Sequence, residues 1–144
     1  MVNTVVIDTN VFVSAFLKAG TAPRQILRLC LSEELKPLMG NALLAEFEEL
    51  LQRDKLFKNG PLSAQEQQDF LNAFLSQCHW VSVYFLWRPN LRDEADNHLL
   101  ELAIAGGATH IITGNTKYFK GTALRFPYIE IVTPSQFLKQ VRSN

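Results

Sequence analysis

Short apolar runs alternate along this chain with longer stretches whose apolar residues recur at helical spacing. The first run, Thr4–Ile7, is β-branched and lacks polar alternation, which is typical of a strand buried in a parallel sheet. We expect strands over Thr4–Ile7, Lys36–Met39, Trp80–Leu86, His110–Thr113 and Tyr128–Val132. We expect helices over Val11–Leu17, Pro23 to about Glu34, Ala42–Gln52, Ala64–Cys78, Asp93–Ala105 and Gln136–Val141. This order predicts an α/β fold in three layers, α/β/α, with a mostly parallel sheet covered on both faces.

Several helix ends carry local sequence signals. Asn10 is the expected N-cap of the first helix, and Pro23 suits the first turn of the second. Ser63, with Glu66 three residues later, predicts a capping box before the fourth helix. The pair Gly106-Gly107 follows the fifth helix and is a favoured residue type just beyond a helix C-terminus.

Length and composition are typical of one ordinary globular domain. The chain has 144 residues, a mass of 16.3 kDa, 47% hydrophobic residues and 19% charged residues. The strongest breaker, Asn59-Gly60-Pro61, lies in a stretch too short to separate two domains. We therefore expect a single domain over residues 1–144.

Charge balance and cysteine usage narrow the function classes. Lysine plus arginine number 14 and aspartate plus glutamate number 14, which excludes a strongly basic nucleic-acid binder but leaves room for a local basic rim. Cys30 and Cys78 lie among apolar neighbours without C-x-x-C spacing, so we expect buried, reduced thiols. No apolar run approaches the roughly 18 residues of a membrane span, and no secretory pattern opens the chain. These features predict a cytoplasmic protein without membrane association.

Polar side chains collect where the expected strands end. Asp8 follows the first strand, Glu46 lies early in the helix after the second, and Asn115 follows the fourth. Asp93 and Asp96 share one face at the start of a helix because they are three residues apart. Ligands of parallel sheets bind beyond the carboxyl ends of the strands, so we expect these side chains to converge. Close carboxylates repel one another, and an all-oxygen set favours Mg²⁺ or Mn²⁺ over zinc.

Each of these residues also has a simpler explanation. Asp8 is able to cap the first helix, although a better cap follows two residues later. Glu46 taken alone fits a solvated helix residue, and Asn115 beside a glycine fits a turn. Asp93 and Asp96 stabilise a helix N-terminus through the helix dipole whatever else they do. The combination of all five, in this order along an α/β chain, is what favours a metal site.

Three blocks of this sequence resemble the PIN-domain ribonucleases. The first is VVIDTNVFVSAFL, with Asp8-Thr9-Asn10 after the first strand. In NALLAEFEELLQRDKL, Glu46 takes the second acidic position of the family, and in DEADNHLLELAIAGGATHIITGN, Asp96 takes the third. The resemblance covers nearly the whole chain and is closest to the toxins of bacterial and archaeal toxin–antitoxin pairs. It implies an Mg²⁺- or Mn²⁺-dependent RNA endonuclease that a cognate antitoxin protein holds silent and that often forms a homodimer.

The resemblance and the expected convergence together suggest roles for the polar residues. Asp8 and Asp96 are expected to ligate the main ion directly, and Glu46 to orient the attacking water or to bind the ion through it. Asp93 and Asn115 are expected at a second, weaker ion position, because many PIN domains carry a fourth acid where this chain has Asn115. Hydrogen bonds that fix these carboxylates are expected from Thr9, Asn10 and Thr113.

Contact with RNA is expected from cationic residues that border the carboxylates. The candidates for phosphate contacts are Arg88, Arg92, Lys117, Lys120 and Arg125, for which solvated surface charges are an equally good explanation. Tyr118 and Phe119 are candidates for stacking on unpaired bases, although packing is the commoner role of such a pair. The histidines His79, His98 and His110 are expected to be structural, with His98 pointing away from the face of Asp96.

Other functions compete with a ribonuclease. A haloacid-dehalogenase-type phosphatase needs a second aspartate where this chain has Asn10, and a response-regulator receiver needs a phosphoacceptor aspartate at a strand end in mid-chain. A PIN-like binding module without turnover is favoured by Asn115 and opposed by the three retained acids. A dimer face and core packing explain three apolar residues of the fourth helix equally well, namely Phe70, Leu71 and Phe74.

Overall fold

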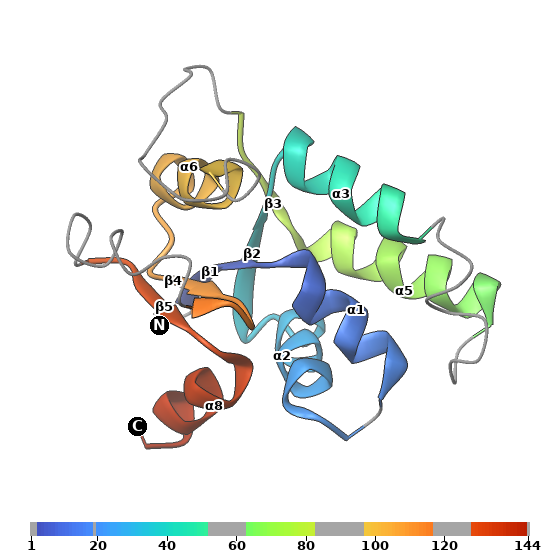
Figure 1. The fold of residues 1–144 in the computed structure, drawn as a ribbon, viewed down its shortest axis with the longest axis horizontal. Coiled ribbons are helices and arrows are strands. Elements are labelled where there is room, and N and C mark those ends of the chain that lie inside the picture. The colour runs from blue at the N-terminus through green and yellow to red at the C-terminus, as the bar shows by residue number, and fades with distance from the viewer. Residues whose placement is uncertain (1–2, 19, 52–62, 83–96, 117–127, 144) are drawn as a thin grey trace.

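In the part of the chain that the structure describes, five strands form a sheet in the order β3-β2-β1-β4-β5 (Figure 1). The computed structural model describes residues 3–18, 20–51, 63–82, 97–116 and 128–143. The strands are β1 (Asn3–Ile7), β2 (Leu35–Met39), β3 (His79–Trp80), β4 (His110–Ile112) and β5 (Glu130–Val132). Every pairing is parallel, and Ile7 lies beside Ile112 and Ile112 beside Val132, so these strands end in register. The predicted parallel sheet is confirmed.

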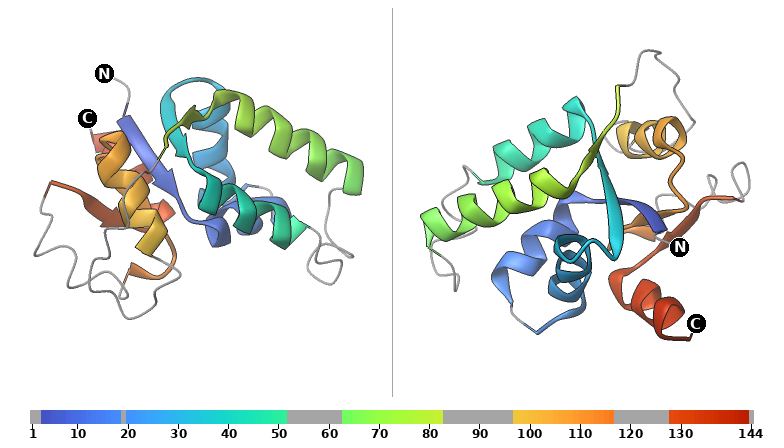
Figure 2. Two further views of the ribbon diagram at one scale, coloured as in Figure 1. Left: turned by 90° about the horizontal axis from the view of Figure 1, so that it is seen from above. Right: turned by 180° about the vertical axis from the view of Figure 1, so that it is seen from behind.

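Helices lie on both faces of this sheet and complete the predicted three-layer α/β/α arrangement. They are α1 (Thr9–Leu17), α2 (Ala22–Leu31), α3 (Asn41–Leu51), α5 (Ala64–Gln77), α6 (Asn97–Gly106) and α8 (Pro134–Ser143). Helix α6 contacts β1, β2 and β4 on one face, whereas α2 and α8 pack together on the other (Figure 1 and Figure 2). Helix α3 leaves the carboxyl end of β2 and contacts both α1 and α6. This position brings α3 to the edge of the sheet where ligands bind in such folds.

Aromatic side chains pack α1 against α3 and α5. The Phe12 ring is fully buried and lies 4.8 Å from the Phe47 ring and 5.0 Å from the Phe74 ring. Phe70 meets Phe16 edge-on at 5.2 Å. Aromatic pairs at such separations stabilise by about 0.5–1.5 kcal/mol beyond the area they bury. Core packing therefore accounts for the α5 residues that also suited a dimer face, Phe70, Leu71 and Phe74.

The local signals predict two helix starts correctly and miss one. The capping box is present, since Ser63 Oγ accepts from Glu66 N at 3.1 Å and Glu66 Oε1 accepts from Ser63 N at 2.9 Å. Pro23 lies in the first turn of α2, as expected. The assignment of Asn10 as the N-cap of α1 is wrong, because α1 begins at Thr9 and Asp8 holds the N-cap position. Asn10 lies inside the helix with an exposed side chain.

Two glycines determine how α6 ends beside the sheet. Gly107 has a φ of +71°, a left-handed conformation that glycine adopts without strain and that commonly ends helices. The next residue closes the end of the helix, since Ala108 N donates to Ala103 O at 2.8 Å. Gly106 faces β2, and a Cβ there would clash with Leu38 Cδ1 and lie 3.1 Å from a methyl group of Val81. Glycine at position 106 thus leaves room for the side chains of Leu38 and Val81 to pack against α6.

Both cysteines are free thiols, Cys30 buried and Cys78 half-buried. Burial raises the pKa of Cys78 to about 12, and burial together with the neighbouring Cys78 raises the pKa of Cys30. Both thiols are therefore protonated at neutral pH and poorly reactive. Among the described helices, none combines the length and apolar character needed to cross a bilayer.

Parts of several sequence predictions lie outside the described residues. The breaker at 59–61 is one of them. The strand expected over Trp80–Leu86 is described only as far as Ser82, and of its residues only Trp80 belongs to β3. The helix expected from Asp93 is described from Asn97 onward.

Candidate active site

Asp8 lies at the junction between β1 and α1, with its side chain turned to the sheet. Its backbone N donates to Ile112 O at 3.0 Å, and its backbone O accepts from Val11 N at 3.0 Å, so the main chain is held from both sides. The side chain makes no capping hydrogen bond to α1. Its carboxylate is 6% exposed and instead accepts from two threonine hydroxyls. The simpler explanation of Asp8 as a helix cap therefore does not account for its side chain.

Thr113 holds one oxygen of that carboxylate from the end of β4. Its Oγ1 donates to Asp8 Oδ2 at 2.8 Å, and its backbone N donates to Val132 O at 2.9 Å. The residue is fully buried, so water does not compete for the hydroxyl. Asn115 N donates to the same hydroxyl at 3.1 Å, which places the Asn115 backbone beside the site. These contacts agree with the expected role of Thr113 in fixing a carboxylate.

Thr9 connects Asp8 to Glu46 of α3. Thr9 Oγ1 lies 3.3 Å from Asp8 Oδ1 and 3.1 Å from Glu46 Oε1. A hydroxyl carries one hydrogen, so it cannot donate fully to both oxygens. The separation of the two carboxylate oxygens cannot exceed the sum of those two distances. Asp8 is adjacent to Thr9 in the sequence, and Glu46 is 37 residues from it. The Thr9 hydroxyl thus brings these two carboxylates together beyond the carboxyl edge of the sheet.

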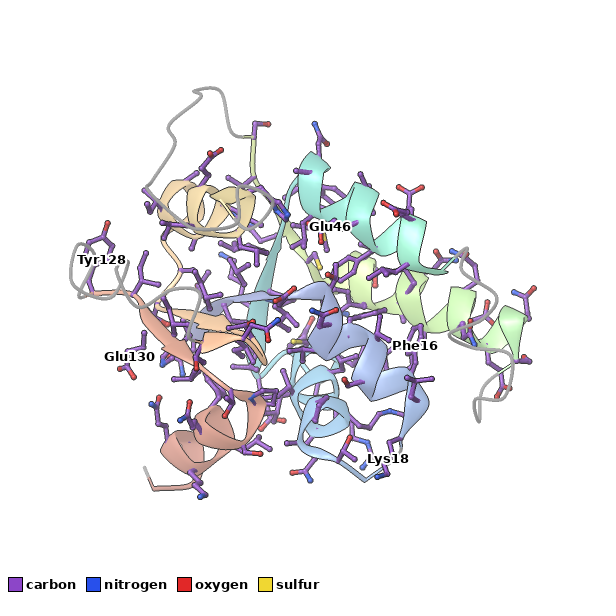
Figure 3. The ribbon with its side chains drawn as sticks, in the orientation of Figure 1. Phe16, Lys18, Glu46, Tyr128 and Glu130 are labelled. Atoms are coloured by element: carbon purple, nitrogen blue, oxygen red, sulfur yellow. The ribbon has the colours of Figure 1, made fainter. Side chains whose placement is uncertain are left out.

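His98 enters the same group of side chains, contrary to the expectation that it points elsewhere. His98 Nε2, in the first turn of α6, contacts Glu46 Oε2, and Glu46 lies between α3 and α6 in Figure 3. The His98 side chain is 19% exposed and that of Glu46 is 38% exposed. His98 Nδ1 is buried and has no hydrogen-bond partner among the described residues. No sequence pattern pairs positions 46 and 98, because the contact depends on how α3 packs against α6.

Glu46 titrates under opposing influences. Burial on its own raises the pKa of this carboxyl. The hydrogen bond from His98, the charge of His98 and the hydrogen bond from Thr9 lower it, and together they outweigh burial, so the pKa of Glu46 lies below its ordinary value. Glu46 is thus an ionised carboxylate at neutral pH, as a cation ligand must be.

Most of the other residues expected at the site lie outside the described residues, so their positions relative to Asp8 and Glu46 stay predictions. These are Asp93 and Asp96 among the acids, Arg88, Arg92, Lys117, Lys120 and Arg125 among the cations, and Tyr118 and Phe119 among the aromatics. Asn10 is described, and it has an exposed side chain and no hydrogen bond to Asp8 or Glu46 within the described ranges. Of the three residues expected to fix the carboxylates, Thr9 and Thr113 therefore do so here.

The carboxylate oxygens at this site are of the ligand type that hard divalent cations prefer. Asp8 and Glu46 offer carboxylate oxygens, the ligands that Mg²⁺ and Mn²⁺ prefer. Within the described ranges, no lysine or arginine forms an ion pair with Asp8, and no three acidic, histidine or cysteine side chains gather as a complete metal site. Two negative groups held this close repel each other, and a cation between them removes that cost. The described part of the chain is thus a fitting portion of such a site.

Comparisons with known proteins agree with this architecture. The family model described as PIN domain matches residues 4–117. The crystal structure of VapBC2 from Rickettsia felis bound to a DNA fragment from their promoter contains a similar chain, with 21% sequence identity, a TM-score of 0.57, and coverage of 89% of this chain and 96% of that chain. At that identity the likeness shows the fold. No curated protein gives a significant match to this sequence. Because the family model spans most of its length, this chain belongs to the PIN-domain family.

Proposed function

We propose that this PIN-domain chain is an endoribonuclease that hydrolyses RNA phosphodiester bonds with Mg²⁺ or Mn²⁺, and that it is the toxin of a toxin–antitoxin pair. The observation that carries the nuclease part is the meeting of Asp8 and Glu46 on the Thr9 hydroxyl at the carboxyl edge of the sheet. The toxin part rests on the sequence blocks that resemble such toxins and on the fold shared with a chain of the VapBC2 structure.

Each residue of the site then has a defined task. A bound divalent ion supplies an activated water and stabilises charge on the phosphate oxygens. Asp8 and Asp96 hold that ion, and Glu46 orients the water or binds the ion through it. Thr9 and Thr113 keep the Asp8 carboxylate in one orientation through their hydroxyls. Asp93 and Asn115 serve a second, weaker ion position, because an amide oxygen brings no charge.

The RNA is held by residues other than the acids. A chain with no net charge has no extended electrostatic grip on RNA, so we expect phosphate contacts from cationic residues close in sequence to the expected acids and to Asn115. These are Arg88, Arg92, Lys117, Lys120 and Arg125, with Tyr118 and Phe119 as stacking partners for unpaired bases. Single substitutions such as Lys117→Ala or Arg92→Ala are expected to flatten the salt dependence of RNA binding.

A partner protein is the second part of the proposal. The R. felis structure holds VapBC2 on a fragment of promoter DNA. By analogy we assign to this chain a cognate antitoxin. From the sequence and its resemblance to such toxins we also propose cytoplasmic action and homodimer formation. Co-expression with the product of an adjacent small gene is expected to relieve growth arrest and to yield a co-purifying complex. Growth that is unaffected by this chain, with or without such a partner, contradicts the toxin assignment.

Asp8→Asn tests the nuclease directly. Asparagine keeps the shape of the side chain and removes its charge, so we expect cleavage of a panel of structured RNAs to fall at least about 100-fold, the loss typical of removing a group that acts mainly in the transition state. EDTA is expected to abolish wild-type cleavage, and Mn²⁺ or Mg²⁺ to restore it. The matched control is Asp69→Asn, an exposed aspartate of α5 distant in sequence from the site.

The outcomes separate the proposed nuclease from its rival. Undiminished cleavage by Asp8→Asn rules out the assignment of this carboxylate. RNA binding without turnover by the wild-type chain, under every metal condition, identifies a PIN-like binding module, as Asn115 in place of an acid favours. Circular dichroism of both variants checks that the fold is retained. Removing the charge of Asp8 relieves repulsion from Glu46, so the metal-free variant is expected to be at least as stable as wild type.

A further inference from the structure

Of the two acids of this site that the structure describes, Glu46 has the greater freedom to move. It lies in the middle of α3, its side chain is 38% exposed, and its neighbours Glu48 and Glu49 on the same helix are exposed to solvent. A glutamate side chain has one of the larger rotamer entropies, which must be lost when it engages an ion. A carboxylate that is already held in place before the ion arrives loses less.

The structure shows what holds Glu46. Its Oε1 meets the Thr9 hydroxyl of α1, and its Oε2 meets Nε2 of His98 on α6. Contacts to both oxygens from two different helices fix the plane of the carboxylate as well as its position. The imidazole is directed at Glu46 alone, since its other nitrogen is buried without a partner among the described residues. Because a carboxylate only accepts hydrogen bonds, Nε2 must carry the hydrogen of this contact.

We propose that His98 is a positioning residue that orients Glu46 for binding of the divalent ion. This inference rests on the proposed function, and it adds a residue that touches neither ion nor RNA. His98 occupies Glu46 Oε2, so the oxygen proposed to face the ion is Oε1, which lies on the side of Asp8 and shares the Thr9 hydroxyl with it. The effect is transmitted through Glu46, so it must disappear when Glu46 is changed.

Binding of Mn²⁺ to the full chain without RNA tests this role. Free Mn²⁺ is measured by electron paramagnetic resonance during titration of the protein. His98→Leu removes the donor and is expected to raise the Kd for Mn²⁺ by about 10–100-fold, as for other residues that orient metal ligands. His98→Gln places an amide N–H near the position of Nε2 and is expected to restore the affinity to within about threefold. His79→Leu, at an exposed histidine of β3, is the matched control and leaves the Kd unchanged.

A double-mutant cycle with Glu46→Gln establishes the route of the effect. In that background His98→Leu is expected to change the Kd by less than about twofold. An equal loss in both backgrounds overturns the inference, as does tighter binding in His98→Leu, which would make His98 a competitor of the ion. If His98→Leu fails to give a wild-type circular dichroism spectrum, His98→Asn, whose amide is too short to reach Glu46, replaces it.

Failure of this inference is distinguishable from failure of the proposed function. Wild-type Mn²⁺ affinity in His98→Leu, together with lost binding in Asp8→Asn, overturns the role of His98 and leaves the metal site intact. Unchanged Mn²⁺ affinity in both Asp8→Asn and Glu46→Gln contradicts the metal site itself.

Discussion

Polar side chains at the two ends of the parallel sheet differ in their hydrogen-bond partners. At the amino end, His110 Nδ1 lies 2.8 Å from Thr109 Oγ1, and His110 Nε2 lies 3.1 Å from Gln140 Oε1. Gln140 Nε2 donates to Glu130 Oε2 at 2.9 Å, so Gln140 Oε1 is the acceptor for His110. Thr109 Oγ1 also lies 3.2 Å from Thr4 O, and the series ends on the exposed Glu130. These contacts agree with the structural role expected for His110.

At the carboxyl end, acceptors outnumber donors. Asp8 and Glu46 bring two carboxylates together, and the donors described beside them are the hydroxyls of Thr9 and Thr113 and Nε2 of His98. Each of the four carboxylate oxygens has a described contact, but two of these contacts share the single hydrogen of the Thr9 hydroxyl. The amino end places one exposed carboxylate among neutral groups, whereas the carboxyl end brings two carboxylates together. The pairing of carboxylates therefore distinguishes the candidate site from the polar network at the amino end.

The largest expected contrast between the two ends is the response to Mn²⁺. An ion that binds only the folded chain stabilises it by about 2.7 kcal/mol at 100 times its Kd. Thermal denaturation of the wild type is therefore expected to shift upward by several degrees in Mn²⁺ and to return in EDTA. Asp8→Asn should lose this shift, while Gln140→Met, at the amino end, should retain it. An unchanged wild-type Tm in Mn²⁺ would contradict cation binding at the carboxyl end.

Removing one hydroxyl from each end is expected to show the next largest difference. Thr113→Val deprives the buried Asp8 carboxylate of its 2.8 Å donor and should cost about 2 kcal/mol, in the range for hydrogen bonds to charged groups. Thr109→Val removes a hydroxyl that is exposed and should cost about 1 kcal/mol or less. Urea denaturation of both variants measures the difference. Equal losses of unfolding free energy would show that Asp8 does not depend on Thr113.

A smaller effect is expected from Gln140→Met, which interrupts the network at the amino end. It leaves His110 Nε2 without its acceptor and should lower the free energy of unfolding by about 1 kcal/mol. RNA cleavage should remain at the wild-type level, because the described hydrogen bonds of Gln140 go to His110 and Glu130 at the amino end. Impaired cleavage in this stable variant would show that the two ends are coupled.

The smallest expected effect is the contribution of Glu46 to the pH dependence of stability. Its folded pKa lies below the ordinary value of 4.5, so the unfolded chain binds more protons in this region. The stabilisation is fully present above pH 4.5 and is lost as the pH falls through the folded pKa. Urea denaturation between about pH 3 and 7 should show a shallower acid decline in Glu46→Gln than in the control Glu48→Gln. Partial exposure of Glu46 keeps this difference small.

Local sequence signals predicted the elements well where a few adjacent residues decide the outcome. The Ser63–Glu66 capping box and the glycine end of α6 are such cases, because their hydrogen bonds form within one turn. The strands β1 and β4 could be predicted because their burial leaves apolar runs, whereas both residues of β3 are exposed. Asn10 misled the assignment of the N-cap, since the β1–α1 junction is set by the bond between Asp8 N and Ile112 O, across the sheet.

The contacts between residues that follow strands could be predicted from the sequence, whereas the contact between two helices could not. Asp8, Thr9 and Thr113 follow strands that end in register, so their proximity follows from the parallel sheet. The pairing of Glu46 with His98 joins residues 52 apart in sequence through helix packing, which no periodicity encodes. The resemblance to PIN domains supplied Glu46 but not its histidine neighbour.

Because Gly106 has no side chain, the C-terminal end of α6 packs closely on β2, and this packing sets the position of His98 near the other end of the helix. A single added methyl group there clashes with the end of the Leu38 side chain of β2, so either that side chain rotates or the helix shifts away from the sheet. His98 is carried near the opposite end of the same rigid helix, and its contact with Glu46 tolerates little displacement. Gly106→Ala would thus change the affinity for the ion through the position of His98. The substituted residue lies at the opposite end of α6 from His98 and is not one of the residues proposed to contact the ion.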